Sequence, residues 1–378
     1  MRGTGWVDRR LFLSRRFAGA ACLCCAGLAQ AAEESGWDRA WSITQLYRSE
    51  TGWIRSVDVS GRFHYDIAYI DSDAGYWHDY DVRRMRLGGK IGFAGDWLLH
   101  VEGSFDYNSW EEELESSLTD AYLAWSSDSG LRFKALKQSA GFTLDGATSS
   151  TRLLTPERNM VANNLWFTTE YFTGFSVAGS VERGWSYKLG AFSSDGDDEL
   201  SDFGTGYFGL ATLKRDFAED LDLDQALLQF DYVYNDDHEE SATADFEHIL
   251  SFSTQWQQGR WGLRTDLAAG HGHAPQPDVW GLVLMPIVDL SERWQLVLRY
   301  TYLDSDGANG LELGRYEDRV VEGQGDRYDE FFAGINLFLY GHKFKLQGGL
   351  QYADMDDAAH DGGRYRGLGI TTALRMYW

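Results

Sequence analysis

Sixteen short segments of the chain alternate apolar and polar residues at every second position. This period of two is that of a β-strand whose two faces lie in different environments. Pro286 lies inside one segment and predicts a bulge or an early strand end there, because proline cannot donate a ladder hydrogen bond. The segments span residues 56–70, 82–93, 97–107, 118–125, 131–137, 175–181, 185–192, 207–214, 226–234, 246–256, 261–269, 280–288, 294–302, 331–340, 343–352 and 364–378.

The connections between these segments alternate between tight turns and long loops. Ala94-Gly95-Asp96 and Gln258-Gly259-Arg260 are tight, whereas the connections after the odd-numbered segments are long and mostly acidic. This alternation predicts antiparallel neighbours with every turn at one end and every loop at the other, which is how outer-membrane barrels are built. An even number of strands returns both termini to the turn side, the periplasm. The long connections span residues 71–81, 108–117, 193–206, 235–245, 270–278, 304–330 and 353–363, together with the stretch 131–172.

The stretch 131–172 is the longest interruption of the pattern, and it predicts a loop that folds into the barrel and narrows it. It begins as a strand, with Leu131, Phe133 and Ala135 on one face and Arg132, Lys134 and Leu136 on the other. Glycines, a Thr-Ser-Ser-Thr run and Pro156 then end the strand. Residues 155–164 predict one or two helical turns with Thr155 as the N-cap and Pro156 at the first position. Residues 138–164 are therefore expected inside the lumen.

The start of the chain predicts a signal peptide that is removed on export. Five arginines precede an apolar run, and Ala29-Gln30-Ala31 offers a small-residue cleavage site. All three cysteines lie in this segment, so the mature chain is expected to have no thiol for redox or metal chemistry. The expected organisation is a signal peptide over residues 1–31, a short periplasmic segment over 32–55 and a barrel over 56–378.

Composition narrows the class of protein further. Aromatic residues make up 15% of the chain, proline accounts for only 4 residues, and the mean hydropathy is −0.39. Such a chain is too polar for a helical membrane protein and too aromatic for a disordered one. The formal charge of −24 argues against nucleic acid as a partner. The alternative of a secreted soluble β-sandwich or barrel requires polar outward faces, whereas the outward faces here are apolar.

Aromatic residues recur at the ends of the segments, where part-polar rings suit the lipid interface. In the last segment, Ile370, Thr372, Leu374, Met376 and Trp378 share one face. A terminal aromatic residue that follows apolar residues at every second position looks like the assembly signal of outer-membrane barrels. Trp378 is therefore expected to guide assembly, and the bacterial outer membrane is the expected location.

Several short motifs follow one another in a characteristic order. They are Val59-Ser-Gly-Arg62, Arg83-Arg84-Met-Arg86-Leu-Gly-Gly, Gly95-Asp96-Trp97, Thr119-Asp120-Ala121-Tyr122, Ala147-Thr148-Ser149-Ser150, Pro156-Glu157-Arg158-Asn159 and Gly190-Ala-Phe192. With them the chain resembles the phosphate-selective porin O and P family of outer-membrane channels. The resemblance implies a usually trimeric porin of about sixteen strands, whose third loop narrows the pore and whose inner wall carries arginines and lysines. Phosphate-specific members place a lysine just before the Ala-Thr-Ser-Ser run, where this chain has Gly146.

The face opposite the apolar one gives thirteen basic and nine acidic lumen positions. These charges are expected to set selectivity, because charges beyond about 8 Å are largely screened at physiological salt. The alternative for any single arginine is an ion pair with a carboxylate on a neighbouring strand. The basic positions are Arg62, Arg84, Arg86, Lys90, Arg132, Lys134, Lys188, Lys214, Arg264, Arg299, Lys343, Lys345 and Arg375, and the acidic ones are Asp58, Asp66, Glu102, Asp106, Asp120, Asp231, Glu247, Asp266 and Glu330. The expected anion-selectivity residues are Arg84, Arg86 and Lys90, Arg132 and Lys134, and Arg152 and Arg158 of the third loop.

These features predict an outer-membrane porin for the passive diffusion of small solutes that prefers anions such as phosphate, polyphosphate and chloride. The alternatives are a general or cation-preferring porin of the same fold, and a barrel hydrolase, although no spacing of Ser, His and Asn selects a catalytic set. No enzymatic activity, cofactor or metal site is expected. The expected partners are small anionic solutes, outer-membrane lipid and lipopolysaccharide, the barrel-assembly machinery and further copies of this chain in a homotrimer.

Overall fold

The computed structural model describes residues 36–105, 116–166, 170–195, 200–204, 206–236 and 241–378. The predicted signal peptide, Asp106, Tyr107 and most of the predicted loop 108–117 lie outside the described residues. The chain divides into two compact units, residues 1–45 and 46–378. Helix α2 (Gly36–Ser42) lies in the first unit, and the short strand β1 spans Gln45–Arg48. None of the described helices combines the length and the apolarity needed to cross a membrane.

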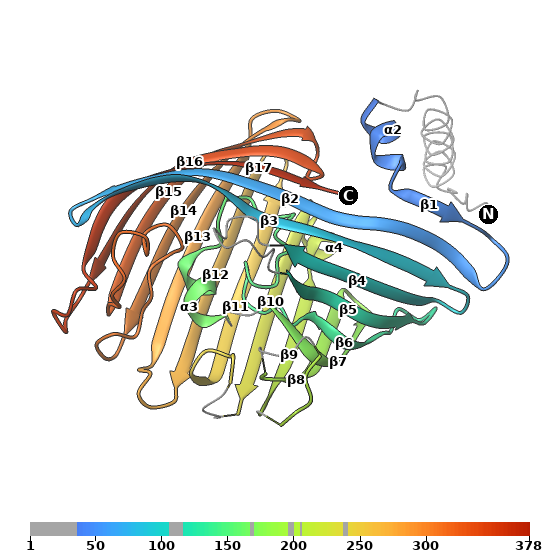
Figure 1. Cartoon of the computed structure of the whole chain (residues 1–378), viewed down its shortest axis with the longest axis horizontal. Coiled ribbons are helices and arrows are strands. Elements are labelled where there is room, and N and C mark those ends of the chain that lie inside the picture. The colour runs from blue at the N-terminus through green and yellow to red at the C-terminus, as the bar shows by residue number, and fades with distance from the viewer. Residues whose placement is uncertain (1–35, 106–115, 167–169, 196–199, 205, 237–240) are drawn as a thin grey trace, which may run out of the picture. The chain divides into compact units, whose positions relative to one another are not determined.

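Sixteen antiparallel strands form a closed ring within the described part of the unit 46–378 (Figure 1). Each strand pairs with the next one in the chain, and β17 pairs with β2 to close the ring. All sixteen predicted segments are strands, so the predicted barrel is confirmed. The strands are β2 (Ile54–Ser72), β3 (Gly75–Phe93), β4 (Trp97–Phe105), β5 (Ser116–Ser126), β6 (Arg132–Ser139), β7 (Tyr171–Val181), β8 (Trp185–Ser193), β9 (Tyr207–Asp216), β10 (Gln225–Asn235), β11 (Phe246–Gln258), β12 (Trp261–Gly272), β13 (Val279–Asp289), β14 (Trp294–Ser305), β15 (Arg327–Tyr340), β16 (Phe344–Asp356) and β17 (Tyr365–Tyr377).

Burial alternates along the strands. In β11, Leu250 and Phe252 are exposed, whereas Ser251 and Ser253 between and beside them are buried. Large apolar side chains stay exposed at alternate positions on most of the strands. Such exposure is unfavourable in water and favourable in a lipid bilayer. The exposed apolar face is therefore the lipid face, and a soluble sandwich or barrel does not fit the structure.

The first hairpin is longer than the sequence predicts. β2 and β3 have 19 residues each, and Ser72 pairs with Gly75 at the tip. The predicted loop 71–81 is therefore wrong. The aspartates of this stretch alternate with aromatic residues such as Tyr76 and Tyr80, and aromatic residues favour a strand.

Pro286 lies within β13 without ending it, since the strand continues to Asp289. The pairing with β14 keeps the same register on both sides of the proline and omits only the rungs at Met285 and Pro286. On the other side, Pro286 still pairs with Leu263 of β12. The predicted bulge or strand end is wrong, because the missing N–H disturbs the ladder toward one neighbour only.

Helix α3 (Met160–Leu165) lies in the connection between β6 and β7. Its N-cap is Asn159, whose side-chain oxygen accepts a hydrogen bond from the Ala162 N–H at 2.8 Å. The predicted start of the helix at Thr155 is wrong. The Thr155 hydroxyl donates to the Glu157 carbonyl oxygen instead, which holds a turn before the helix begins.

Helix α3 lies inside the ring of strands (Figure 1). A hydrophobic core surrounds it. The connection over residues 140–170 is called the first inner loop, of which 140–166 and Glu170 are described. Phe142, Val161 and Leu165 of this loop are fully buried. Helix α3 contacts β12, β13 and β14, so the wall on this side is apolar on its inner face as well. The wall residues of this core include Val233, Ile249, Ala268, Val279, Val283, Met285, Val297 and Leu303.

Candidate functional site

Carboxylates of the wall hold the start of the first inner loop. Asp231 of β10 accepts a hydrogen bond from the Thr143 N–H at 3.1 Å, and Asp266 of β12 accepts one from the Leu144 N–H at 2.7 Å. Both carboxylates are buried. Buried backbone N–H groups require such partners, so this part of the loop is fixed against the wall.

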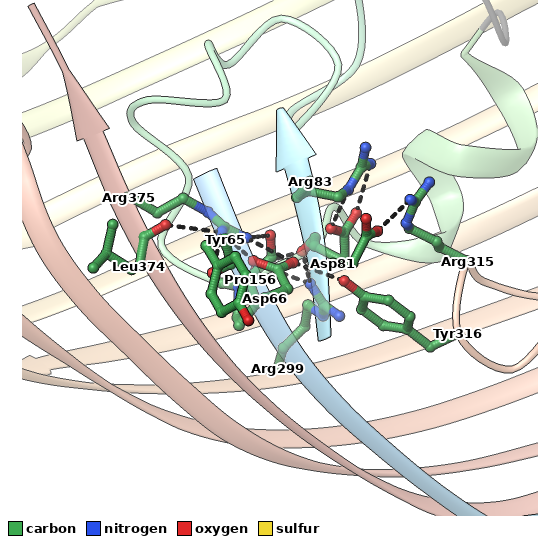
Figure 2. A network of polar contacts seen from close by, with 12 residues as sticks. Tyr65, Asp66, Asp81, Arg83, Pro156, Arg299, Arg315, Tyr316, Leu374 and Arg375 are labelled. Atoms are coloured by element: carbon green, nitrogen blue, oxygen red, sulfur yellow. Dashed lines mark hydrogen bonds and ion pairs between the residues drawn. The ribbon is translucent and has the colours of Figure 1, made fainter. Parts of the chain in front are cut away.

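Side chains of β14 to β17 hold the middle of the same loop (Figure 2). They donate hydrogen bonds to its carbonyl oxygens, with Lys345 and Gln347 on Leu153, Asn336 on Leu154, Arg375 on Pro156 and Arg299 on Glu157. Arg299 is also bidentate to Glu330 at 2.7 and 3.1 Å, and Arg375 is bidentate to Asp66. Arg299, Lys345 and Arg375 therefore face the lumen and position the loop, so they do not offer free charges to a solute.

Open space remains on the other side of the loop, toward β3 to β10. The turn-side cavity has a volume of about 600 Å³ and reaches Gly130 and Ser180 beside the tight turns. The loop-side cavity has a volume of about 480 Å³ and reaches Ser104 and Thr119. The basic residues that line them are Arg62, Arg132, Lys188 and Lys214 in the turn-side cavity and Arg83, Arg84, Arg86, Lys137 and Arg158 in the loop-side cavity.

The loop-side cavity brings together three of the predicted selectivity residues, Arg84, Arg86 and Arg158. Arg84 is only 9% exposed and makes no hydrogen bond or ion pair within the described part of the chain. Arg86 and Arg158 both contact Glu170, at 3.8 and 3.4 Å. The Arg158 guanidinium also lies over the Trp166 ring, 4.4 Å from its centroid. Arg84 is thus a largely buried cation that faces the cavity.

Arg83 also faces the lumen, and the predicted lumen set does not include it. A register shift between His64 and Asp66 gives β3 one extra residue, which is a β-bulge, and two neighbouring arginines then point inward. Arg83 is bidentate to Glu157 of the first inner loop, at 2.6 and 3.0 Å. Burial opposes the charged form of Glu157, but the Arg83 guanidinium holds the pKa of this carboxyl well below its usual range. The sequence contains a signal for this bulge. Arg83 and Arg84 are adjacent, whereas a regular strand with a period of two would place them on opposite faces.

Lys137 lines the loop-side cavity although strict alternation places it on the lipid face. Leu136 before it has a φ of 79°, in the left-handed region that leucine rarely adopts. Lys137 and Gln138 are then both buried, so the inward face changes at the end of β6. The predicted lumen position of Leu136 overlooked this irregularity. Its signal is an apolar residue on the wet face followed directly by a lysine on the apolar face.

The remaining predicted selectivity residues are spread more widely. Arg132 lines the turn-side cavity, whereas Lys90, Lys134 and Arg152 are not among the lining residues of either cavity. The Lys134 ammonium lies over the Tyr122 ring, 4.3 Å from its centroid. Arg152 is exposed on the first inner loop. The structure therefore gathers four of the seven predicted residues at the two cavities.

Glu170 and Tyr171 line both cavities and lie at the boundary between them. The Arg86 guanidinium donates a hydrogen bond to the Tyr171 hydroxyl. Burial opposes the ionisation of Glu170, but the Arg158 and Arg86 guanidinium groups lower the pKa of its carboxyl below the ordinary value. The boundary is therefore an ionised carboxylate between two arginines.

The connection between β14 and β15 also folds inward, and residues 306–326 are called the second inner loop. Its Tyr316 hydroxyl donates to the buried Asp66 at 2.8 Å (Figure 2), and the Tyr316 ring stacks on Trp77 with the centroids 5.7 Å apart. The sequence predicts this acidic connection as one of the long loops at one end of the barrel, but these aromatic and polar contacts attach it to the first hairpin. Its further contacts pair Arg315 with Asp81 and Glu312 with Asn164 of the first inner loop.

Most of the residues that line the two cavities lie in a part of the chain that matches a known family. Residues 57–213 match the family described as phosphate-selective porin O and P. Over this segment, the chain is similar to that porin family. The match confirms the resemblance predicted from the motifs, and it covers β3, β6, β7 and the first inner loop. Among curated protein sequences, none matches the chain.

The fold is similar to that of solved outer-membrane porins. The anion-selective porin from Comamonas acidovorans superimposes with a TM-score of 0.60 at 12% identity, over 85% of this chain and 99% of that one. The outer-membrane channel DcaP of Acinetobacter baumannii gives 0.57 at 12% identity, over 87% and 99%. OprB of Pseudomonas putida gives 0.59 at 9% identity, over 91% and 96%. The family match over residues 57–213 and the barrel fold indicate a porin of the bacterial outer membrane, which is a channel rather than an enzyme.

Proposed function

We propose that this porin lets small solutes diffuse passively and that it prefers anions. The observation that carries the proposal is the charge of the loop-side cavity. Arg84 lines this cavity and makes no hydrogen bond or ion pair among the described residues, which supports a role for its charge in attracting a solute. The Comamonas porin is anion-selective, which supports the proposal. The cavity sets Arg83, Arg84, Arg86, Lys137 and Arg158 against the carboxylates of Glu157 and Glu170.

The strength of the attraction follows from the low effective dielectric of a narrow passage. At an effective dielectric near 20, a contact at 4 Å attracts an anion by roughly 4 kcal/mol before desolvation is subtracted. Several weak sites in series let an ion enter and still leave. Arg84 in the loop-side cavity and Arg132 in the turn-side cavity are such sites at two depths.

The proposal includes chloride and phosphate as solutes, with shallow binding of both. The lysine of phosphate-specific relatives has no room at Gly146. A Cβ at this position would collide with the Phe142 carbonyl oxygen and lie 2.8 Å from Thr143 Oγ1 and 3.0 Å from Trp166 Cγ. The loop is too tightly packed here to carry a long side chain without moving its backbone.

One contact between a serine and a histidine bears on the alternative of a barrel hydrolase. Ser60 Oγ lies 3.2 Å from His100 Nε2, and Asp120 lies 4.0 Å from His100 Nδ1. Both Ser60 and His100 are buried, and neither lines one of the two cavities. A nucleophile without access for a substrate and a third residue beyond hydrogen-bond reach do not make a catalytic triad. This geometry does not favour hydrolysis.

Zero-current potentials in a potassium chloride gradient across a planar bilayer test the anion preference. Arg84→Glu reverses the charge of this cavity-lining residue. It is expected to lower the anion-to-cation permeability ratio roughly tenfold, the change that about 1.4 kcal/mol produces. Arg366→Glu is the control, because Arg366 is exposed and its charge is screened, so this ratio should not move. A wild-type channel that prefers potassium contradicts the proposal.

The proposal extends to how the chain reaches and occupies the membrane. We propose export with a cleaved signal peptide over residues 1–31, insertion by the barrel-assembly machinery, and a homotrimer among lipid and lipopolysaccharide. The apolar outer face of the strands supports contact with lipid. Mass measurement of the mature chain and light scattering of the detergent-solubilised porin test the cleavage and the trimer.

A further inference from the structure

We infer that Glu170 is a specificity-determining residue, an internal carboxylate that occupies an oxyanion site between Arg86 and Arg158 and that a permeating oxyanion displaces. This inference rests on the proposed function and goes beyond it. It assigns the site a ligand class, small oxyanions such as carboxylates and sulfate, rather than anions in general. It also assigns Glu170, a negatively charged residue of the passage, a role in the choice of solute.

The contacts of Glu170 are looser than those of Glu157, the other carboxylate that lines the loop-side cavity. Glu170 makes one contact with each arginine, at 3.4 and 3.8 Å. By contrast, Glu157 is bidentate to Arg83 at 2.6 and 3.0 Å. Long single contacts are weaker than bidentate pairs, so Glu170 exchanges for another carboxylate more easily than Glu157 does.

The two arginines are held in place without Glu170. Arg158 donates to the carbonyl oxygens of Asp145 and Thr148 at 3.0 and 3.2 Å, and its guanidinium is stacked on an indole ring. Arg86 donates to the Tyr171 hydroxyl, and its guanidinium lies 4.9 Å from the centre of that ring. Both guanidinium groups therefore stay directed at the boundary when the Glu170 carboxylate moves. The site that remains is preorganised for an oxyanion.

The position of Glu170 puts it on the path. It lines the turn-side and the loop-side cavity alike, so a solute that moves from one to the other passes its carboxylate. A planar or tetrahedral oxyanion presents two oxygens to two guanidinium groups, whereas chloride presents one centre. The exchange of one carboxylate for another leaves the charge of the site unchanged and both arginines paired, which makes oxyanions the better matched solutes.

The test compares Glu170→Gln with Glu157→Gln in single-channel recordings of chloride current, with sulfate added as the probe. Both variants remove one carboxylate from the loop-side cavity, but only the first empties the proposed site. We expect sulfate to block Glu170→Gln at roughly tenfold lower concentration than the wild type. Glu157→Gln should stay within about twofold of the wild type, because its arginine lies away from the boundary. Equal block in the wild type and Glu170→Gln overturns the inference, and so does an equal gain in both variants, which would be an effect of net charge alone.

A second experiment tests the same inference with a different variant of Glu170. The chain has no cysteine after Cys25, so Glu170→Cys places a unique thiol at the boundary of the barrel expressed without residues 1–31. Modification with the negatively charged sulfonatoethyl methanethiosulfonate should return the sulfate block toward the wild-type value, whereas the positively charged aminoethyl reagent should not. No difference between the reagents overturns the inference. A wild type that prefers potassium contradicts the proposed function instead, whichever way the Glu170 variants behave.

Discussion

At the scale of single residues, Asp66 has two tasks in the lumen. It is fully buried, it is bidentate to Arg375, and it accepts the Tyr316 hydroxyl at 2.8 Å. Arg375 in turn donates to the Pro156 carbonyl oxygen at 2.9 Å. One carboxylate therefore links the wall to both inner loops.

Asp66→Asn is expected to destabilise the folded barrel by about 3–5 kcal/mol, because it leaves the buried Arg375 guanidinium without its counter-ion. The urea midpoint of the detergent-solubilised porin measures this. Asp354→Asn is the matched control, since its partner Arg366 is half exposed and such pairs contribute little. Equal midpoints for Asp66→Asn and the wild type would show that the pair adds no stability.

The sequence could locate some of the lumen charges and not others, for reasons of backbone geometry. Alternation places Arg84 and Arg86 on the wet face because a regular strand has a period of two. Arg83 and Lys137 escape this rule, because a bulge in β3 and a left-handed residue before Lys137 change the face locally. Alternation also does not tell a free cation from a bonded one. Only the folded loop shows that Arg299 is bound, while Arg84 makes no hydrogen bond or ion pair with another described residue.

At the scale of elements, the first inner loop is fixed on one side and accessible on the other. Ala147 is exposed and lines the turn-side cavity, whereas Ser150 is buried and accepts a hydrogen bond from Arg62 at 2.8 Å. A thiol label at Ala147→Cys is therefore expected to react within minutes and to reduce the conductance several-fold. Ser150→Cys should react far more slowly, since its neighbours cover it. Mass spectrometry of the labelled fraction, alongside the conductance, checks both, and equal labelling rates would place the loop differently.

The second inner loop carries a carboxyl that links its position to pH. Glu317 is buried, and the Tyr328 hydroxyl donates to it at 3.4 Å. Burial, and then the charge of Glu330, raise the pKa of Glu317 to about 7, while Arg299 and Tyr328 act in the opposite direction. The docked loop thus prefers the protonated form of this group. The free energy that it contributes to docking is fully present below the ordinary pKa of 4.5 and is lost as the pH rises to about 7.

We therefore expect the second inner loop to loosen between pH 5 and pH 7, by up to about tenfold per pH unit in its docking equilibrium. The conductance should rise over this interval and then level off, because a loop that folds inward and then loosens leaves more of the lumen open. Glu317→Gln mimics the protonated group and should make the conductance independent of pH in this range. A wild-type conductance that is constant from pH 5 to pH 8 would contradict the prediction.

The sequence of β13 indicates where the first inner loop docks, although the search for alternating segments does not detect this. β13 is apolar on both faces, with Val283 and Met285 buried in the core and Trp280 and Leu284 exposed. A barrel strand with water on its inner side alternates, so a strand that is apolar throughout indicates that protein packs against it inside. The alternation of neighbouring strands was enough to predict the ring. The partner of β13 depends on contacts between distant segments.

At the scale of the whole molecule, the ring closes where the last residue meets the first long strand. The Trp378 N–H donates to the Gly61 carbonyl oxygen at 3.0 Å, and the Gly61 N–H donates to the Trp378 carbonyl oxygen at 3.1 Å. A Cβ on Gly61 would lie only 2.6 Å from Trp378 Cζ2, so the indole covers the glycine. The terminal aromatic residue therefore forms part of the closed seam between β17 and β2.

Deletion of Trp378 is expected to lower the yield of assembled barrel several-fold, because it removes two seam hydrogen bonds worth about 0.5–1.5 kcal/mol each and the ring that covers Gly61. The fraction that migrates as a folded, heat-modifiable band measures assembly. Trp378→Phe is the control that keeps the backbone and an aromatic ring, and it should assemble at near wild-type yield. Full assembly without Trp378 would show that neither the seam contacts nor the terminal aromatic residue is required.

The two sides of this barrel have different roles: one holds the first inner loop, and the other borders the open cavities. The strands β10 to β17 fix the first inner loop through Asp231, Asp266, Arg299 and Lys345, while the strands β3 to β9 border most of the open cavities. For the design of a nanopore sensor, this means that the strands that line the cavities are largely distinct from the strands that hold the loop. Cavity-lining residues of β3 to β9 can be exchanged to suit an analyte, while the contacts from β10 to β17 that hold the first inner loop are kept.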